Sequence, residues 1–430
     1  MEHGDRALDF ADLALRVRAE IDPAAYALEH DFPRDEYELR RARARTLMAQ
    51  HGLDALAITS SGVGYWFTGR PEPHSWHDRV AARSAWFVLT ADRDVLLCAP
   101  TNNQHLDAVR RSVWVTDVLP LVERAAWPRR EMWGLEQIPY RLRQIGIESG
   151  RLGFELGDCM TLGISFNDFE RLRELLPRAA LVDASAVIRQ LMSVHTPLEI
   201  ERLRAACAAG VWVHEQIGVV LRPGMTEREL IEALAQAFSA SFPSNDGYVY
   251  ARAGGWDVRN ADRRDSNRYH TQITERRYRL NDVICRGNSG ASYRGYDADV
   301  DRVWHVGAAP STECHDWYRV AHEANREMAA RIRPGARCSD VYAAYEQVLA
   351  RHGFPAAVAG RVGHGIRNTG GLSVHPDNRT VLEPDMVISV EPMIGDAHGY
   401  FDQEDQYLVT QTGAECLHQP SPAELPCVPW

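Results

Sequence analysis

The sequence predicts two domains of different class: an α/β domain over residues 1–188, and an α+β domain over residues 189–430 that is built from two related halves. Three observations support this prediction. The chain has 430 residues, which is more than a single hydrophobic core usually holds. Strand-like runs alternate with helical segments in the first part, and a helix–turn–helix pattern occurs twice in the second.

The first domain begins with a segment rich in helix formers, residues 35–51, and the following Gly52 favours a helix end. The apolar runs 86–89 and 95–98 are separated by a short polar turn and therefore predict a hairpin. Further strands are expected at the remaining short apolar runs, which are residues 53–58, 113–118, 152–155 and 180–183.

A long helical stretch from Ser185 to about Val220 links the two domains. It is interrupted at Pro197, where a second helix can start because proline suits the first turn of a helix. The composition changes little here, so the boundary at residue 188 depends on this helical link alone. The Pro-rich end of the chain, residues 420–430, is expected to form an extended tail.

The second domain contains the tripeptide Arg-Pro-Gly twice, at 222–224 and 333–335, and each copy lies between two helical segments. Thr226 and Glu229 have the spacing of a capping box after the first copy, and Ser339 is expected to cap the helix after the second. The repeat predicts two pseudo-symmetric α+β halves. The alternative is that both turns simply end helices, as Pro-Gly turns often do.

The composition excludes several enzyme classes. All 48 basic residues are Arg, and the chain contains no Lys. Schiff-base enzymes, P-loop proteins and protein kinases each need a Lys for their chemistry, so these classes are excluded. The simplest explanation for the missing Lys is a coding bias towards Arg codons.

The charge and the termini also restrict the partners and the location. A formal net charge of −11 argues against general nucleic-acid binding, which needs a basic surface. No apolar run approaches the ~20 residues of a membrane span, and the polar N-terminus lacks the pattern of a signal peptide. The 8 Cys residues form no C-x-x-C pair and suggest no disulfide framework. We therefore expect a cytoplasmic protein with a small-molecule substrate and no nucleic-acid or membrane partner.

Three acidic residues, Asp297, Asp299 and Asp301, alternate along a segment of strand-like composition. In a continuous strand their side chains would share one face and would repel one another. A cation or neighbouring Arg side chains would then be needed to hold them together. The segment is therefore a candidate metal site.

Three more positions carry metal-ligand side chains in strand or turn contexts. His364 lies between two glycines, Glu391 follows the apolar strand 387–390, and Glu404 precedes the strand 407–409. Each residue alone is more often a turn or surface residue than a ligand. Together with Asp299 they form a mixed oxygen and nitrogen set that suits Mn, Fe, Co or Zn.

In this order and spacing the motifs resemble the pita-bread family that includes aminopeptidase P, prolidase, methionine aminopeptidase and creatinase. The resemblance covers roughly residues 185–415 well and the N-terminal domain more loosely, and it implies a pita-bread fold for the second domain. The matching segments are Gly295-Tyr296-Asp297-Ala298-Asp299, Arg333-Pro334-Gly335, Gly363-His364-Gly365, Leu382–Val387, Val390-Glu391-Pro392 and Glu404-Asp405.

Metal-using members of the family bind two metals between two Asp, one His and two Glu. By position, the last four of these ligands match Asp299, His364, Glu391 and Glu404. The first Asp lies eleven residues before the second, where this chain has Asn288. The resemblance therefore implies a single divalent transition metal (Mn, Fe, Co or Zn) rather than a dinuclear site.

Other residues are similar to creatinase, a metal-free member that hydrolyses a C–N bond in a small guanidino acid. His270 matches the general acid/base of creatinase, and imidazole is chemically suited to that role because it titrates near neutral pH. Asp301 replaces a residue that is usually Thr, and His375 resembles the second His of the family. These three residues are the expected catalytic groups, and a creatinase-like route without a metal stays open.

Members of the family take part of their substrate specificity from the N-terminal domain of a dimer partner. In this chain that segment contains Trp76, Arg79 and Arg83, and Arg302 is a further candidate for binding a substrate carboxylate. The sequence thus predicts a homodimeric hydrolase that cleaves a C–N bond in a small, zwitterionic, amino-acid-like substrate. The alternatives are an Xaa-Pro aminopeptidase or dipeptidase, a sulfonium-propionate-type lyase, and a catalytically inactive pita-bread binding protein.

Overall fold

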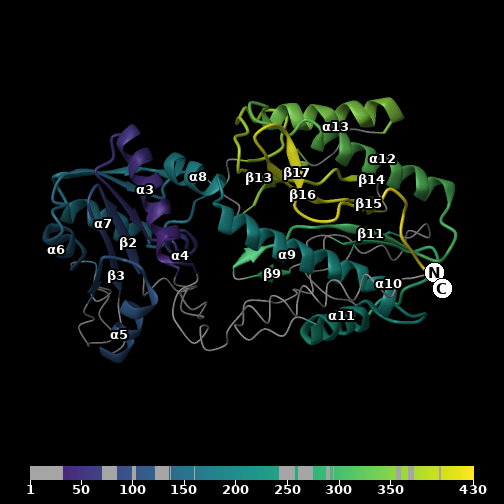
Figure 1. Ribbon diagram of the computed structural model, residues 1–430, viewed down its shortest axis with the longest axis horizontal. Helices are drawn as coiled ribbons and strands as arrows, with labels where there is room; N and C mark the ends of the chain where they lie inside the picture. The colour runs from purple at the N-terminus through teal and green to yellow at the C-terminus, as the bar shows by residue number, and fades with distance from the viewer. Residues whose placement is uncertain are drawn as a thin grey trace. The chain divides into compact units, whose positions relative to one another are not determined.

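The structure is a computed structural model of the chain, and its elements are labelled in Figure 1. Contacts divide the chain between Met192 and Ser193 into two compact units, within helix α8 (Ser185–Ser193). The boundary expected from the sequence, residue 188, lies in the same helix. The structure describes residues 32–69, 85–98, 103–121, 135, 137–158, 160–241, 257–259, 275–286, 291–293, 295–354, 360–366, 372–396 and 399–430.

The N-terminal unit is built on a six-stranded mixed sheet with the order β4-β3-β2-β1-β5-β6. Strands β1, β2 and β3 pair antiparallel, whereas β4, β5 and β6 join the sheet as parallel strands. The strands are β1 (Ala55–Ile58), β2 (Trp86–Thr90), β3 (Asp94–Cys98), β4 (Asp117–Pro120), β5 (Gly150–Phe154) and β6 (Ala179–Asp183). The helices are α3 (Arg34–Gln50), α4 (Ser61–Thr68), α5 (Asn103–Ser112), α6 (Gln137–Gln144), α7 (Phe166–Leu175) and α8.

Side chains alternate across this sheet and bury two apolar faces. In β1, Ala55 and Ala57 pack with α6 and α7, whereas Leu56 and Ile58 pack with α3, α4 and α8. This alternation is what a strand period of two produces in a sheet covered on both sides. The expected strands are therefore confirmed, except over residues 113–116. There Val113 packs with the core side of α5, and strand β4 begins only at Asp117.

The C-terminal unit has two antiparallel sheets, one in each half of the predicted repeat. Their orders are β18-β11-β8-β7 and β12-β13-β16-β17, and only β18 pairs in parallel. The strands of the first are β7 (Asp257–Arg259), β8 (Val283–Arg286), β11 (Arg302–Val306) and β18 (Cys427–Val428). The strands of the second are β12 (Gly363–Gly365), β13 (Val387–Val390), β16 (Asp405–Val409) and β17 (Ala414–Cys416). Two short pairs complete the set: β9 (Ser292–Tyr293) with β10 (Tyr296–Asp297), and β14 (Ile394–Asp396) with β15 (Gly399–Phe401).

Each half of the C-terminal unit also contains helices. The first half contains α9 (Pro197–Glu215), α10 (Ile217–Val220) and α11 (Glu227–Ser241), and the second contains α12 (Thr312–Ala329) and α13 (Cys338–His352). Helices α12 and α13 lie along one side of the sheet that contains β13, β16 and β17 (Figure 1), and their apolar faces form a common core with it.

The two Arg-Pro-Gly turns have matching geometry, which confirms the predicted pseudo-symmetry. Gly224 and Gly335 both adopt φ +83°, a conformation that glycine reaches without steric cost. Two residues after each glycine the chain makes an isolated antiparallel bridge, Thr226 with Arg277 and Arg337 with Val381. The two turns therefore occupy equivalent positions in the two halves.

Two local expectations have different outcomes. The capping box of Thr226 and Glu229 is present, because each side chain accepts the backbone N–H of the other residue. Ser339 was expected to cap α13, and that prediction is wrong: the cap is Arg337, whose N–H donates to Asp340. Ser339 lies inside the helix and its Oγ accepts from Arg379 at 3.0 Å instead.

The C-terminal segment is extended as expected, but it packs against the unit instead of forming a tail. Strand β18 pairs with β11, and the N–H of His305 donates to Pro426 O at 2.8 Å. Tyr318 donates to Pro422 O at 2.6 Å, and Leu425 is buried in the core. The Pro-rich composition is compatible with this packing because β18 is an edge strand. No helix in the described part of the chain is long and apolar enough to cross a membrane.

Candidate metal centre

Four predicted ligands converge at one end of the second sheet. His364 lies in β12, Glu391 directly follows β13, and Glu404 directly precedes β16. The strand register aligns these positions, because Gly363 is opposite Val390 and Val390 is opposite Asp405. Asp299 comes from the irregular link at residues 298–301, between β10 and β11.

Three carboxylates surround the Nε2 atom of His364. The nearest is Asp299 Oδ2 at 3.1 Å, followed by Glu404 Oε1 at 3.7 Å and Glu391 Oε1 at 4.0 Å. Zinc bonds to nitrogen and oxygen are about 2.1 Å long, so two donors on one ion lie at most about 4.2 Å apart. All three distances satisfy this limit, and the donor atoms of Asp299, His364 and Glu404 lie within 4.8 Å of one another. The distances from His364 are therefore compatible with one metal ion, with Asp299, His364 and Glu404 as the tightest group and Glu391 beside them.

The glycines beside His364 have a steric reason. A Cβ atom at Gly363 would lie 2.3 Å from Ser389 O, so only glycine lets β12 approach β13 this closely. On the other side, Nδ1 of His364 lies 3.1 Å from Gly365 O. A hydrogen bond from Nδ1 fixes the tautomer that directs the lone pair of Nε2 towards the carboxylates, as is common for metal-binding His.

The electrostatics of the cluster show an excess of negative charge. Burial lowers the pKa of His364, but the hydrogen bond and charge of Asp299 and the charge of Glu391 raise it more, so the net pKa is above its usual value. Burial and the charges of Asp299, Asp301 and Glu391 raise the pKa of Glu404 well above the usual range. A divalent cation would reverse both effects, because it stabilises the carboxylates and competes for Nε2.

Neighbouring residues orient the two Glu ligands. Ser389 Oγ donates a hydrogen bond to Glu404 Oε1, and the Glu404 side chain is only 3% exposed. Arg361 Nε lies 3.4 Å from Glu391 Oε1, outside hydrogen-bond geometry. Burial is the main cause of the raised pKa of Glu391, and the charges of His364 and Arg361 oppose it. Glu404 therefore forms the floor of the site, while Asp299, His364 and Glu391 form its more open side, with exposed fractions of 19%, 14% and 12%.

Comparison with known proteins identifies the chain. Residues 201–411 match metallopeptidase family M24, and residues 40–194 match the creatinase/prolidase N-terminal domain. The chain therefore contains a metallopeptidase family M24 domain preceded by a creatinase/prolidase N-terminal domain. The first match contains all four proposed ligands of the metal centre.

Curated relatives have several different activities. The probable dipeptidase PepE of Mycobacterium tuberculosis is 32% identical over 258 residues, which cover 57% of this chain and 64% of PepE. The creatinase of a Bacillus species is 25% identical over 408 residues, covering 89% of this chain and 90% of creatinase. The ectoine hydrolase of Halomonas elongata is 22% identical over 417 residues, covering 90% of this chain and 96% of that enzyme.

Solved structures confirm the fold. The crystal structure of dipeptidase PepE from Mycobacterium ulcerans has a TM-score of 0.74 at 23% identity, and the alignment covers 93% of this chain and all of PepE (100%). The Xaa-Pro dipeptidase from Bacillus anthracis has a TM-score of 0.72 at 20% identity, covering 91% and 99% of the two chains. The pita-bread fold expected for the second domain is thus confirmed.

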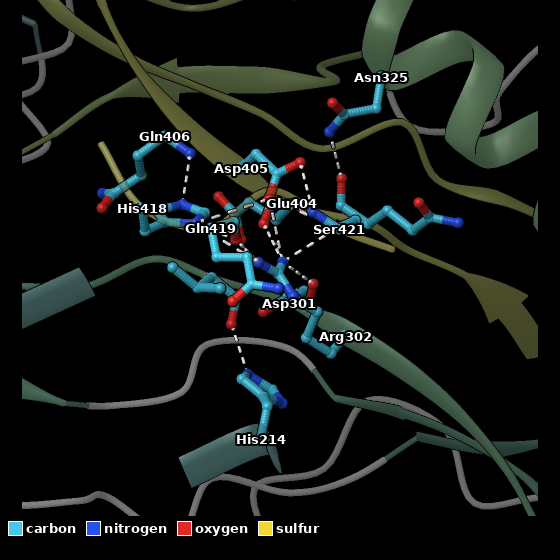
Figure 2. Close-up of polar contacts among 12 residues, drawn as sticks. His214, Asp301, Arg302, Asn325, Glu404, Asp405, Gln406, His418, Gln419 and Ser421 are labelled. Atoms are coloured by element: carbon cyan, nitrogen blue, oxygen red, sulfur yellow. Dashed lines mark hydrogen bonds and ion pairs between the residues drawn. The ribbon is translucent and has the colours of Figure 1, made fainter. Parts of the chain in front are cut away.

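A second polar group in this M24 chain lies at the start of β16, and we call it the Arg302 cluster: Arg302, Asp405, His418 and Ser421. Figure 2 shows the Arg302 guanidinium at its centre. Nη1 of Arg302 pairs with Asp405 Oδ1 at 3.0 Å and donates to Ser421 Oγ at 3.0 Å. Nη2 lies 2.9 Å from Gln419 O and 3.4 Å from His418 Nδ1.

Donors of Asp405, Cys416 and His418 also lie within 4.8 Å of one another, but their chemistry does not fit a metal. The guanidinium of Arg302 already supplies the cation for Asp405. His418 uses Nε2 to accept the N–H of Gln406 and Nδ1 to contact Gln419 O, and burial lowers its pKa to about 4. Burial raises the pKa of Cys416 to about 12, so this thiol stays protonated near neutral pH.

The other predicted site residues have different outcomes. His270, Trp76, Arg79 and Arg83 lie outside the described residues, as does Asn288, and their roles stay predictions.

Two expected catalytic residues are described. Asp301 is 3% exposed, its N–H donates to Glu404 O at 3.2 Å, and its charge acts on Glu404. His375 contacts other partners: its Nδ1 accepts the N–H of Asp377 at 3.2 Å and its ring lies 6.4 Å from that of Tyr342. Neither contact includes a ligand of the metal centre, so the catalytic role of His375 stays a prediction.

Arg302 was expected to bind a substrate carboxylate, but its guanidinium contacts acceptors of the protein itself. Its side chain is 7% exposed, and its guanidinium contacts protein acceptors on both nitrogens. A substrate carboxylate cannot replace these acceptors without breaking the Arg302 cluster. These contacts favour a structural role for Arg302, and its role in substrate binding stays a prediction.

Sequence reasoning missed the residues that support the centre. Asn325 of α12 donates to Gln403 O at 2.6 Å and accepts from Tyr407 at 3.0 Å, which fixes the segment that carries Glu404. Nε2 of His214 in α9 lies 2.7 Å from O of Val300, the residue that follows Asp299 in the chain; Figure 2 shows His214 below Arg302. One signal was available: residues 402–406 are five consecutive polar residues directly before an apolar strand, and all five are buried.

Proposed function

We propose that this chain is a metal-dependent hydrolase that cleaves a C–N bond in a small, zwitterionic, amino-acid-like substrate. The observation that carries the proposal is the convergence of three carboxylates on Nε2 of His364, within the distances that one ion requires. The match to metallopeptidase family M24 supports it. The relatives are named as a dipeptidase, a creatinase and an ectoine hydrolase, and each of these names describes the hydrolysis of a C–N bond in a small substrate.

The residues that would hold the ion are Asp299, His364, Glu391 and Glu404, and we propose one ion rather than two. The position of the family's first Asp is Asn288 here, so a second ion would lose a carboxylate. Imidazole with three carboxylates suits Mn, Fe, Co or Zn. A bound ion of this kind polarises the scissile group and lowers the pKa of a water molecule.

The protein residues have distinct roles in this proposal. Gly365 O orients His364 and Ser389 orients Glu404, so both donors are fixed before the ion binds. His270 is the proposed proton carrier, since a neutral imidazole can accept a proton from the attacking water and return it to the leaving nitrogen. Asp301, buried against Glu404, adds negative charge beneath the centre.

A zwitterionic substrate needs a cationic group for its carboxylate, and Arg361 is suitably placed. Its side chain is 49% exposed and its Nε lies 3.4 Å from Glu391 Oε1, at the rim of the centre. Arg302, by contrast, is committed to protein acceptors. The proposal keeps a homodimer in which Trp76, Arg79 and Arg83 reach the partner's site, and it keeps a cytoplasmic location. The seven described cysteines, all free, are typical of a reducing compartment.

Dipeptide hydrolysis is the second candidate, because the 32% identity to the probable dipeptidase PepE favours it. The two candidates share the metal centre and differ only in the group beyond the scissile nitrogen. A substrate screen therefore distinguishes them: Xaa-Pro and other dipeptides on one side, and amidines, ectoine-like rings and sulfonium propionates on the other.

The proposal is tested by metal analysis of the purified protein together with this screen. We expect about one transition-metal ion per chain, and a His364→Ala variant that loses the ion and at least about 100-fold in turnover, as expected for loss of a first ligand. Wild-type protein that turns over a substrate equally well after complete metal removal would contradict the metal-dependent mechanism. A lyase product from a sulfonium propionate, or the absence of turnover with every substrate class, would contradict the hydrolase assignment.

A further inference from the structure

Arg302 connects the two backbone segments that carry Asp299 and Glu404. Its Nη1 atom donates to Asp301 O at 2.8 Å and to Glu404 O at 3.0 Å. Glu404 is itself a proposed ligand, and Asp301 lies two residues after the ligand Asp299. One nitrogen thus bridges the two segments, and Figure 2 shows Arg302 beside Asp301 and Glu404.

Asp405 and the C-terminal segment also bind the Arg302 guanidinium. Asp405 pairs with Nη1, and Gln419 O accepts from Nη2. Asp405 is fixed in turn, because the N–H of Ser421 donates to its carboxylate at 3.2 Å. The C-terminal segment around residues 418–421 therefore prevents the guanidinium from rotating away from the two carbonyl groups.

We propose that Arg302 is a positioning residue for the metal centre. Its guanidinium sets the spacing between Asp299 and Glu404 that one ion requires, and the inference rests on the metal site of the proposed function. Arg is specifically suited to this task because its planar fork presents several N–H groups in fixed directions. A Lys ammonium has only three N–H groups on one nitrogen, so it cannot serve Asp405, both backbone carbonyls and Gln419 O at the same time.

An Arg302→Lys variant therefore separates charge from geometry. Supporting residues around metal sites typically change metal affinity 10- to 100-fold, and we expect Arg302→Lys to weaken Zn²⁺ binding about 10-fold. Affinity is measured by titrating the metal-stripped full-length protein with Zn²⁺ in competition with a chelator. A Co²⁺-loaded sample provides a second readout, because its visible spectrum reports the coordination geometry and should change in the variant.

Arg276→Lys is the matched control. Arg276 makes a bidentate pair with Asp282 at 2.7 and 2.9 Å in the same unit, and both side chains are at least nine-tenths buried. The same substitution there removes the same fork from a carboxylate that is no proposed ligand. We expect it to lower stability and leave the Zn²⁺ affinity and the Co²⁺ spectrum unchanged.

A second variant keeps the test possible if Arg302→Lys does not fold. The double variant Arg302→Gln/Asp405→Asn removes both charges together, which is tolerated far better than leaving one buried charge unpaired. It also lacks the guanidinium bridge, so we expect the same loss in Zn²⁺ affinity, about 10-fold.

The outcomes distinguish this inference from the proposed function. Wild-type protein that binds no Zn²⁺ overturns the metal centre and this inference together. Wild-type protein that binds Zn²⁺, with unchanged affinity in both Arg302 variants, overturns the inference alone. An equal loss of affinity in Arg276→Lys also overturns it, because the effect would then follow general stability rather than the position of Arg302.

Discussion

The metal centre and the Arg302 cluster meet at the start of β16 and use the same kinds of residue, yet their charge balance is opposite. Glu404 belongs to the first and Asp405, the next residue, to the second. In the metal centre three carboxylates face one imidazole, whereas in the Arg302 cluster the only carboxylate of that defined set is matched by a guanidinium. The two histidines differ accordingly: the pKa of His364 is raised, and the pKa of His418 is lowered to about 4.

The difference shows that residue types alone do not define a metal site. A cluster with its own cation is complete as protein, and its histidine stays neutral because burial and the nearby guanidinium disfavour a second positive charge. A cluster with surplus carboxylates is stable only when a proton or a metal ion compensates them. Glu404 directly precedes β16 and Asp405 is its first residue, so the start of this strand serves both clusters.

The largest expected effects come from substituting Glu404 and Asp405 separately, because one belongs to the metal centre and the other to the Arg302 cluster. Asp405→Asn leaves the buried Arg302 guanidinium without its counter-charge, and breaking such a pair costs about 3 to 5 kcal/mol. Glu404→Gln removes one of the mutually repelling carboxylates, so we expect the metal-stripped protein to become more stable than wild type. Urea unfolding at pH 7 measures both changes.

For Zn²⁺ binding we expect the opposite ranking, with Glu404→Gln affected more than Asp405→Asn. Glu404→Gln removes a ligand and should abolish Zn²⁺ binding despite the gain in stability. If both substitutions destabilise the metal-stripped protein equally, the two clusters do not differ in charge balance and the comparison fails.

The next prediction uses pH to compare the two histidines. Burial gives His418 a folded pKa of about 4, below the 6.5 of an unfolded histidine, so the unfolded state takes up a proton first as pH falls. Its contribution is therefore complete above pH 6.5 and is lost as pH falls towards 4, by about 3 kcal/mol in total. His364 has the opposite sign: its raised pKa favours the folded state at low pH, and that contribution is lost as pH rises through its folded value.

A His418→Gln variant isolates this effect, because the amide stays neutral throughout the range. The difference in unfolding free energy between wild type and variant cancels the titration of all other groups. We expect this difference to shift in favour of the variant between pH 6.5 and 4. Parallel curves over that range would show that His418 is not held in its neutral form.

The sequence predicted the four residues that converge at the candidate metal centre better than the residues that surround them. Glu391 and Glu404 were predictable because each adjoins an apolar strand whose register is set by burial. His364 was predictable from its glycines, which the close approach of β12 and β13 requires. The resemblance to the pita-bread family then assembled these local signals into one site and gave the correct fold.

The rest depended on contacts between segments far apart in the chain. Asp297, Asp299 and Asp301 do not share a strand face, because residues 298–301 are irregular: Asp297 is exposed and Asp301 is buried. Arg302 was expected to bind a substrate carboxylate because the chain has no Lys and the Arg fork suits a carboxylate. Only the path of residues 418–421 shows that its guanidinium is already enclosed.

The smallest expected effect tests how far the C-terminal segment contributes beyond enclosing Arg302. Ser421 Oγ accepts from Arg302 at 3.0 Å and donates to Asp405 at 3.4 Å, while the Ser421 N–H makes its own bond to Asp405. Ser421→Ala removes only the hydroxyl, so we expect a loss of about 1 kcal/mol in unfolding free energy. The bridge from Arg302 to the two carbonyl groups remains in this variant. Zn²⁺ affinity should therefore stay within about twofold of wild type, a difference close to the error of such comparisons. A loss of affinity as large as that of Arg302→Lys would instead assign the spacing of the ligands to the C-terminal segment.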